Sequence, residues 1–224
     1  MDLQIPSGQA IALVGPNGCG KTSFLNILNG FNIPTSWSIL FYQQDITHLS
    51  VQQRAKLGIW RVFQSFGIFK NLSLYENLAL AFVDKLSWKQ KILPLKFLPQ
   101  DYKNKITEVL QELDLLEKQD ELAWNLSGWQ MRLLEIARLY LQDTKVFLLD
   151  EPTAWVSPKL KWKVIHLLNK IIETGKTVII VEHDFVFLWE FVERLLVMDD
   201  GKIVLDGSYE TIKHDPVLKK IYFG

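Results

Sequence analysis

The chain has 224 residues, 48% of them hydrophobic and 22% charged, and its 25 basic and 25 acidic residues balance. This predicts one folded domain, with or without a subdomain, rather than a disordered chain. The balanced charge argues against a protein that binds nucleic acid through a broad basic surface. A single cysteine excludes an internal disulfide. No secretory leader is evident, and no apolar stretch approaches the roughly 20 residues of a membrane-spanning helix.

Short apolar runs alternate with segments of helical periodicity, which predicts an α/β fold with a mostly parallel sheet. The expected strands are residues 11–14, 38–41, 146–149, 178–181 and 195–198. The expected helix faces are Ile106, Val109, Leu110 and Leu113; Leu133, Ile136, Ala137 and Tyr140; and Leu160, Val164, Leu167 and Ile171. Gly30 and Gly175 follow helical runs as left-handed caps. Residues 199–201, Asp-Asp-Gly, predict a hairpin turn.

Residues 84–105 carry six lysines around Pro94 and Pro99 and are expected to form an irregular insertion between helices. A solvated connector and a patch that binds lipid or a partner remain alternative interpretations of this stretch.

The strongest motif is a phosphate loop between an apolar strand and the helical run 21–29. Residues 15–22, Gly-Pro-Asn-Gly-Cys-Gly-Lys-Thr, match G-x-x-x-x-G-K-[ST]. Backbone amides and the helix N-terminus would surround phosphate, Lys21 would reach the β- and γ-phosphates, and Thr22 would bind Mg²⁺. The nucleotide-binding residues expected here are Gly15, Pro16, Asn17, Gly18, Cys19, Gly20, Lys21, Thr22 and Ser23.

A second motif is an apolar strand, residues 146–149, that ends in two carboxylates. After a phosphate loop, this pattern is typical of a Walker B strand. We expect Asp150 to hold Mg²⁺, usually through water, and Glu151 to polarise the attacking water.

Residues 126–130, Leu-Ser-Gly-Trp-Gln, resemble the LSGGQ signature of the ATP-binding-cassette (ABC) ATPases. Gln64 resembles the family's Q-loop glutamine, and His183 its switch histidine, in the family's order. The resemblance runs from about residue 2 to the end of the chain. It implies a P-loop NTPase fold, with a RecA-like core at 1–64 and 142–224 and an inserted helical subdomain at about 65–141. It also implies ATP and Mg²⁺ as ligands.

The resemblance further implies that two subunits pack head to tail around each ATP. Ser127, Gly128, Trp129 and Gln130 would then contact the nucleotide held by the opposite chain. Gln64 would bind near Mg²⁺ and sense the transmembrane partner, and His183 would act in catalysis beside Glu151. The region from Gln64 to about Lys105 would receive the membrane subunits.

Within the family, the chain is most similar to the ATPases of branched-chain amino-acid and urea-type importers, through residues 58–64, 133–138, 181–184 and 221–224. This implies permease subunits, an indirect solute-binding protein, no nucleic acid and a peripheral place on the cytoplasmic face of the inner membrane. The lipopolysaccharide-export ATPase is also similar. A soluble cassette protein of translation or repair is another alternative, but such proteins usually carry two cassettes in one chain, whereas this chain has one phosphate-loop motif.

Five tryptophans stand where the family pattern has glycine: Trp37, Trp60, Trp124, Trp129 and Trp155. Glycine allows positive φ and close backbone approach, whereas an indole needs space and a partner for its N–H. Our hypothesis is that UGA codons for glycine were translated as tryptophan. If the tryptophans are genuine, Trp129 would obstruct the ATP sandwich, and the chain would be a degenerate, non-hydrolysing nucleotide-binding scaffold.

The sequence departs from the family pattern at two other places. Ser157 replaces the usual acid or amide of the D-loop, and the N-terminus is short. The chain begins a few residues before its first core strand, so the family's N-terminal strands and adenine-stacking aromatic residue are missing. Either the start was assigned late or adenine is held weakly.

Overall fold

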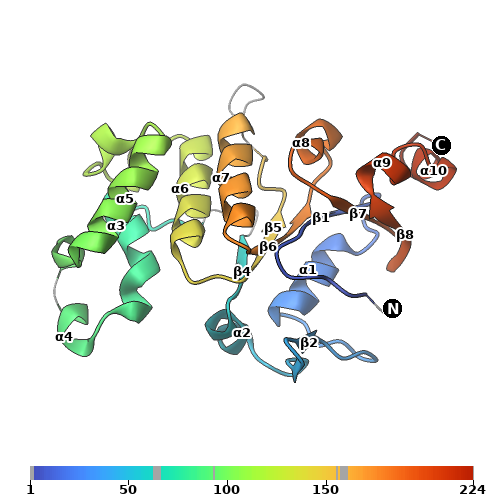
Figure 1. Ribbon diagram of the computed structural model, residues 1–224, viewed down its shortest axis with the longest axis horizontal. Helices are drawn as coiled ribbons and strands as arrows, with labels where there is room; N and C mark the ends of the chain where they lie inside the picture. The colour runs from blue at the N-terminus through green and yellow to red at the C-terminus, as the bar shows by residue number, and fades with distance from the viewer. Residues whose placement is uncertain (1–2, 63–66, 93, 155, 157–160, 224) are drawn as a thin grey trace. The chain divides into compact units, whose positions relative to one another are not determined.

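The computed structural model describes residues 3–62, 67–92, 94–154, 156 and 161–223 (Figure 1). The chain divides into two compact units. The first comprises Met1–Gln64, Thr144–Pro152 and Leu168–Gly224, and the second comprises Ser65–Asp143 and Thr153–Leu167. Residues 153–167 therefore group with the second unit, whereas the family resemblance implies that they belong to the core.

The first unit is built on a six-stranded sheet with the order β4-β5-β6-β1-β7-β8. Its strands are β1 (Ala10–Val14), β4 (Ile59–Val62), β5 (Val146–Asp150), β6 (Thr177–Val181), β7 (Arg194–Asp199) and β8 (Lys202–Ser208). All neighbours are parallel except β7 and β8. β1 and β6 are buried along their whole length, as near-continuous apolar strands of a parallel sheet should be. The mostly parallel α/β fold is confirmed.

The strand expected at residues 38–41 is shorter than predicted. Only β2 (Leu40–Phe41) forms, and it pairs with β3 (Gln44–Asp45) in a separate two-stranded hairpin. β4 was not among the expected strands. The turn at residues 199–201 is confirmed, because Asp200 and Gly201 both have positive φ between β7 and β8.

The helices of the first unit are α1 (Lys21–Asn29), α2 (Val51–Leu57), α8 (Phe185–Trp189), α9 (Tyr209–Ile212) and α10 (Pro216–Phe223), while α7 (Lys161–Glu173) belongs to both units. α1 follows the phosphate loop directly, packs against β4 and β5, and ends at the left-handed Gly30. Arg54 of α2 is fully buried and donates to the carbonyls of Ile27 (2.6 Å) and Leu28 (3.0 Å). This guanidinium supplies hydrogen-bond donors to carbonyls in the last turn of α1.

The second unit is helical. It contains α3 (Leu74–Ala79), α4 (Trp88–Lys91), α5 (Gln100–Glu112), α6 (Gly128–Leu141) and the 3₁₀ turns η1 (Leu80–Lys85), η2 (Leu95–Phe97), η3 (Leu116–Lys118) and η4 (Ala123–Asn125). The expected irregular insertion at 84–105 is wrong in part, because α4 lies inside it and α5 begins within it, immediately after Pro99. Proline fits just ahead of a helix, where its missing N–H costs nothing.

The described helices include none with the length and apolar character needed to span a bilayer.

Candidate functional site

The phosphate loop joins the buried end of β1 to α1 at the carboxyl edge of the sheet. Gly20 is the N-cap of α1 and is left-handed, with φ of 109°. Asn17, Gly18, Thr22 and Ser23 are exposed, while Gly15, Cys19 and Lys21 are buried. The helix N-terminus and the exposed loop backbone therefore face solvent together, as an anion site requires.

The Lys21 side chain is folded back onto this loop. Its Nζ donates to the carbonyl oxygens of Gly15 (2.7 Å) and Pro16 (2.9 Å). A buried ammonium needs hydrogen-bond acceptors. Here the loop carbonyls are the acceptors, and in a nucleotide complex we expect phosphate oxygens to take their place. Lys21 is thus positioned to exchange these bonds for bonds to phosphate.

Gly15 admits no side chain. A Cβ at this position would lie 2.1 Å from the Met198 carbonyl oxygen of β7. The Cys19 carbonyl also accepts the N–H of Gly201 (2.9 Å). The loop is therefore held against the end of β7 through backbone contacts, which explains a glycine here by packing.

The two Walker B carboxylates have different environments. The Asp150 side chain is 3% exposed, and its Oδ2 accepts from Arg61 Nη2 at 2.7 Å. Its Oδ1 is buried and has no hydrogen-bond partner. Such an unsatisfied acceptor suits the coordination sphere of a metal ion. Among the described residues, no group of three or more His, Cys, Asp or Glu side chains is placed to hold a metal ion. In nucleotide sites Mg²⁺ is commonly held by one or two carboxylates together with phosphate and water.

Glu151 and His183 come together at the same edge. Glu151 Oε1 lies 3.4 Å from His183 Nε2, and both side chains are about one-third exposed. Glu151 has a left-handed φ of 49°, and its N–H donates to the Val181 carbonyl at 2.9 Å. This bond ties the end of β5 to the end of β6, from which His183 follows. The carboxyl ends of parallel strands thus deliver the expected base and histidine side by side.

The signature motif begins α6 in the second unit. Ser127 is its N-cap, and Gln130 Oε1 accepts from both the Ser127 N–H (3.0 Å) and its Oγ–H (2.8 Å). Gly128 and Trp129 form the first turn, and the Trp129 ring lies 6.0 Å from Lys163 Nζ. The signature is therefore a capping box at the start of a helix.

α6 is anchored to the segment that follows the Q-loop by a buried charged cluster. Glu135 accepts from the Gly67 N–H (2.8 Å) and from Arg132 (2.7 Å), and Arg138 donates to the Gly67 carbonyl (2.6 Å). Burial raises the pKa of Glu135 and lowers the pKa of Arg132. The ion pair and the Gly67 N–H compensate the buried carboxylate.

Several expected residues lie outside the described part of the chain, namely Gln64, Trp155 and Ser157. Of the other tryptophans, Trp60 lies in β4 rather than at a turn, and Trp124 is 66% exposed. Sequence reasoning also missed Arg61, although its place three residues before Gln64 was a signal that it lies near the site.

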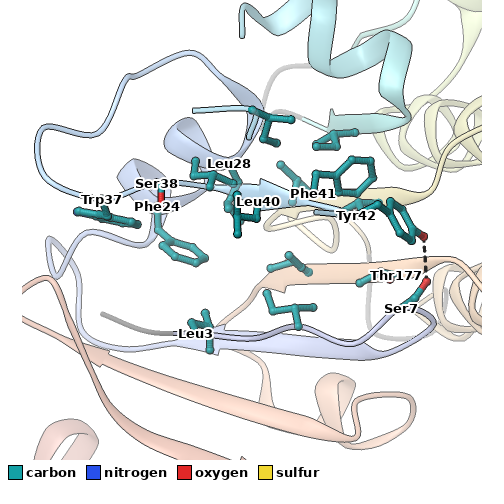
Figure 2. A pocket seen from close by; sticks show the side chains of 17 residues that line it. Leu3, Ser7, Phe24, Leu28, Trp37, Ser38, Leu40, Phe41, Tyr42 and Thr177 are labelled. Atoms are coloured by element: carbon teal, nitrogen blue, oxygen red, sulfur yellow. Dashed lines mark hydrogen bonds between the residues drawn. The ribbon is translucent and has the colours of Figure 1, made fainter. Parts of the chain in front are cut away.

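An apolar cavity of about 390 Å³ also lies in the first unit (Figure 2). Phe24, Trp37 and Leu40 line it from α1 and the hairpin segment, and Ser7 Oγ lies 3.2 Å from the Tyr42 hydroxyl at its rim. It reaches Ile59, Val146 and Thr177, the first residues of β4, β5 and β6. The phosphate loop follows the opposite end of the parallel strands, so the cavity is distinct from the phosphate site.

Comparisons with known proteins agree with this geometry. Residues 1–154 match the family model described as ABC transporter. The chain is 30% identical to the probable branched-chain amino acid transport ATP-binding protein LivG of Archaeoglobus fulgidus, covering 100% of this chain and 88% of that protein. It is also 30% identical to the lipopolysaccharide export system ATP-binding protein LptB of Acidithiobacillus ferridurans, covering 100% and 89%.

Solved structures show the same fold. A nucleotide-free ATP-binding cassette from an ABC transporter superposes with a TM-score of 0.82 at 27% identity, covering 99% of this chain and 90% of that one. A dimeric cassette in a post-hydrolysis state, bound to ADP and Pi, gives a TM-score of 0.76 at 26% identity, covering 92% and 88%. The phosphate loop, the Walker B carboxylates and these matches together lead to one conclusion: the chain belongs to the ABC transporter family, as an ATP-binding subunit.

Proposed function

We propose that this chain binds Mg-ATP at the edge of its sheet and hydrolyses it to drive transport across a membrane. The observation that carries the proposal is the 3.4 Å approach of Glu151 to His183 at the edge where the phosphate loop also begins. A carboxylate and an imidazole at that distance are suited to orient and polarise one water molecule.

Each residue has a distinct task in this proposal. The loop amides and Lys21 bind the phosphates, and Lys21 gives up the Gly15 and Pro16 carbonyls to do so. Glu151 polarises the attacking water, while His183 holds that water and the γ-phosphate. Thr22, Gln64 and Asp150 would hold Mg²⁺, which when bound neutralises charge on the phosphate oxygens.

Phosphate release by the purified chain tests catalysis. Glu151→Gln keeps the size of the side chain but removes its basicity, and general-base catalysis contributes roughly 10²- to 10⁴-fold. We expect Glu151→Gln to lower the rate of phosphate release by about that factor. Glu173→Gln is the matched control, since Glu173 is exposed at the end of α7, shortly before β6 begins. Equal rates in the wild type and Glu151→Gln would contradict catalysis at this site.

The proposal includes a second cassette packed head to tail, with Ser127, Gly128, Trp129 and Gln130 serving the partner's nucleotide. The similar cassette that is dimeric with ADP and Pi supports it. The non-hydrolysing scaffold remains the alternative, and it is favoured by the bulk of Trp129 within the signature.

We further propose import of a branched-chain amino acid or related solute, with permease subunits at the cytoplasmic face of the membrane and a solute-binding protein acting indirectly. The second unit exposes large apolar side chains in the region expected to receive the membrane subunits: Phe69 (56%), Trp88 (71%), Ile92 (73%) and Phe97 (57%). These side chains share one stretch of the sequence, residues 69–97, and a partner that covers them would bury their apolar area. A permease pair and a solute-binding protein encoded beside the gene would support import, whereas lipid-export components would contradict it.

A further inference from the structure

Arg61 connects three segments of the candidate site. It lies in β4, its Nη2 binds Asp150 Oδ2 of β5 at 2.7 Å, and its Nη1 donates to Asn26 Oδ1 of α1. The Arg61 and Asp150 side chains are each only 3% exposed. One guanidinium therefore ties the Walker B strand to the phosphate-loop helix.

This pairing divides the two oxygens of Asp150 between different tasks. Oδ2 is occupied by Arg61, whereas Oδ1 is buried without a hydrogen-bond partner. A carboxylate fixed at one oxygen loses rotational freedom, so the other oxygen is presented in one direction only. Groups that hydrogen-bond a metal ligand in this way orient it and tune the affinity of the site.

We propose that Arg61 is a positioning residue that sets the Mg²⁺ dependence of the site by holding Asp150 Oδ1 toward the metal. This inference rests on the proposed Mg-ATP site and deepens it. Arg61 acts through Asp150 and Asn26, so its removal affects the metal requirement more than the affinity for nucleotide without metal.

Two effects of the guanidinium oppose each other. Its positive charge repels a nearby cation and would weaken Mg²⁺ binding. It also compensates a buried carboxylate, which without a partner would be strongly destabilising and free to reorient. The second hydrogen bond, to Asn26, limits the motion of the guanidinium itself. Because Arg61 and Asp150 are both held in place, we expect the orientation of the Asp150 carboxylate to outweigh the repulsion between the guanidinium and Mg²⁺.

The test is the fluorescence of N-methylanthraniloyl-ADP bound to the purified chain, measured while Mg²⁺ is titrated and again in EDTA. Arg61→Met removes the charge and the hydrogen bonds to Asp150 and Asn26 while keeping an unbranched side chain. We expect the Mg²⁺ concentration at half-saturation to rise about 10- to 100-fold, in the range found for residues behind metal ligands. Affinity in EDTA should stay within about twofold, and Arg61→Lys should recover part of the Mg²⁺ affinity.

Arg194→Met is the matched control, because Arg194 also pairs with an aspartate, Asp206, but on the β7–β8 hairpin. It should leave Mg²⁺ half-saturation unchanged. If Arg61→Met does not fold, Arg61→Lys decides the question, since an ammonium lacks the planar fork with which the guanidinium reaches Asp150 and Asn26 and should still raise the Mg²⁺ requirement. An unchanged or lower requirement in the folded Arg61 variant would overturn the proposal. A wild-type chain that showed no Mg²⁺ dependence would instead overturn the proposed Mg-ATP site itself.

Discussion

Lys21 illustrates how a single residue is prepared for its ligand. Its ammonium is buried and bonded to two carbonyls of its own loop, so it is neither unsatisfied nor exposed to solvent. Phosphate must replace these neutral acceptors with charged ones, and charge-assisted hydrogen bonds are the stronger kind. The exchange therefore favours nucleotide without unfolding the loop.

Trp129 is the signature residue whose bulk bears on the proposed head-to-tail arrangement. It stands in the first turn of α6, where the signature would approach the partner's nucleotide. Overpacking by an extra side chain costs roughly 1–3 kcal/mol, and each 1.4 kcal/mol on a barrier is about tenfold in rate. We predict that Trp129→Gly raises phosphate release about ten- to hundredfold and promotes ATP-dependent dimers, measured by light scattering in the Glu151→Gln background.

Trp88→Gly is the control for this change, since Trp88 also lies in the first turn of a helix with an N-cap serine and is 71% exposed. Trp88→Gly should alter neither the rate of phosphate release nor the formation of ATP-dependent dimers. If Trp129→Gly matched the wild type in both measurements, the indole of Trp129 would not obstruct dimerisation or hydrolysis. The hypothesis of a mistranslated glycine is decided separately by the codon at position 129, where UGG would exclude it.

At the scale of elements, the β7–β8 hairpin supplies a pH-dependent contribution to stability. Arg194 binds both carboxylate oxygens of Asp206 at 2.6 Å, and these hydrogen bonds lower the pKa of Asp206 from its ordinary value. A carboxylate with a lowered folded pKa stabilises the protein above its unfolded pKa. That contribution is lost as the pH falls through the folded pKa.

We predict that Asp206→Asn lowers the free energy of unfolding by no more than about 1 kcal/mol at pH 7, because the pair is partly exposed. The difference from the wild type should be constant between about pH 5 and 7 and should shrink progressively below about pH 5, where the carboxyl of the unfolded chain begins to protonate. Urea denaturation at several pH values measures it, with Asp199→Asn as the control in the same hairpin. A difference already lost at about pH 6 would point to another group.

Strands with uninterrupted apolar runs could be predicted from the sequence. Elements whose pattern is broken by a charged residue or by a proline could not. β1, β5, β6 and β7 were each expected within a residue or so of their bounds. β4 was missed because Arg61 interrupts its apolar pattern, and this buried arginine is explained by its bonds to Asp150 and Asn26, which are distant in the sequence. The start of α5 was missed because Pro99 was interpreted as part of an irregular stretch.

At the scale of the whole molecule, the order of strands decides which motifs meet. Because β6 pairs with both β5 and β1, Glu151, His183 and the phosphate loop end at one edge of the sheet. The motifs predicted which residues lie at this edge, and their chemistry stays a prediction. The Arg61–Asp150 pair spans 89 positions, and the apolar cavity gathers residues from Leu3 to Ile179. Neither could be predicted from local patterns, because both depend on strand pairing.

The central claim is that the phosphate loop binds a magnesium nucleotide through Lys21, and equilibrium binding of N-methylanthraniloyl-ATP to Lys21→Met tests it most directly. Loss of charge-assisted bonds worth about 1.5–3 kcal/mol should weaken binding roughly 10- to 100-fold. Lys56→Met, on the exposed face of α2, should bind as the wild type does. Full affinity in Lys21→Met would contradict the account.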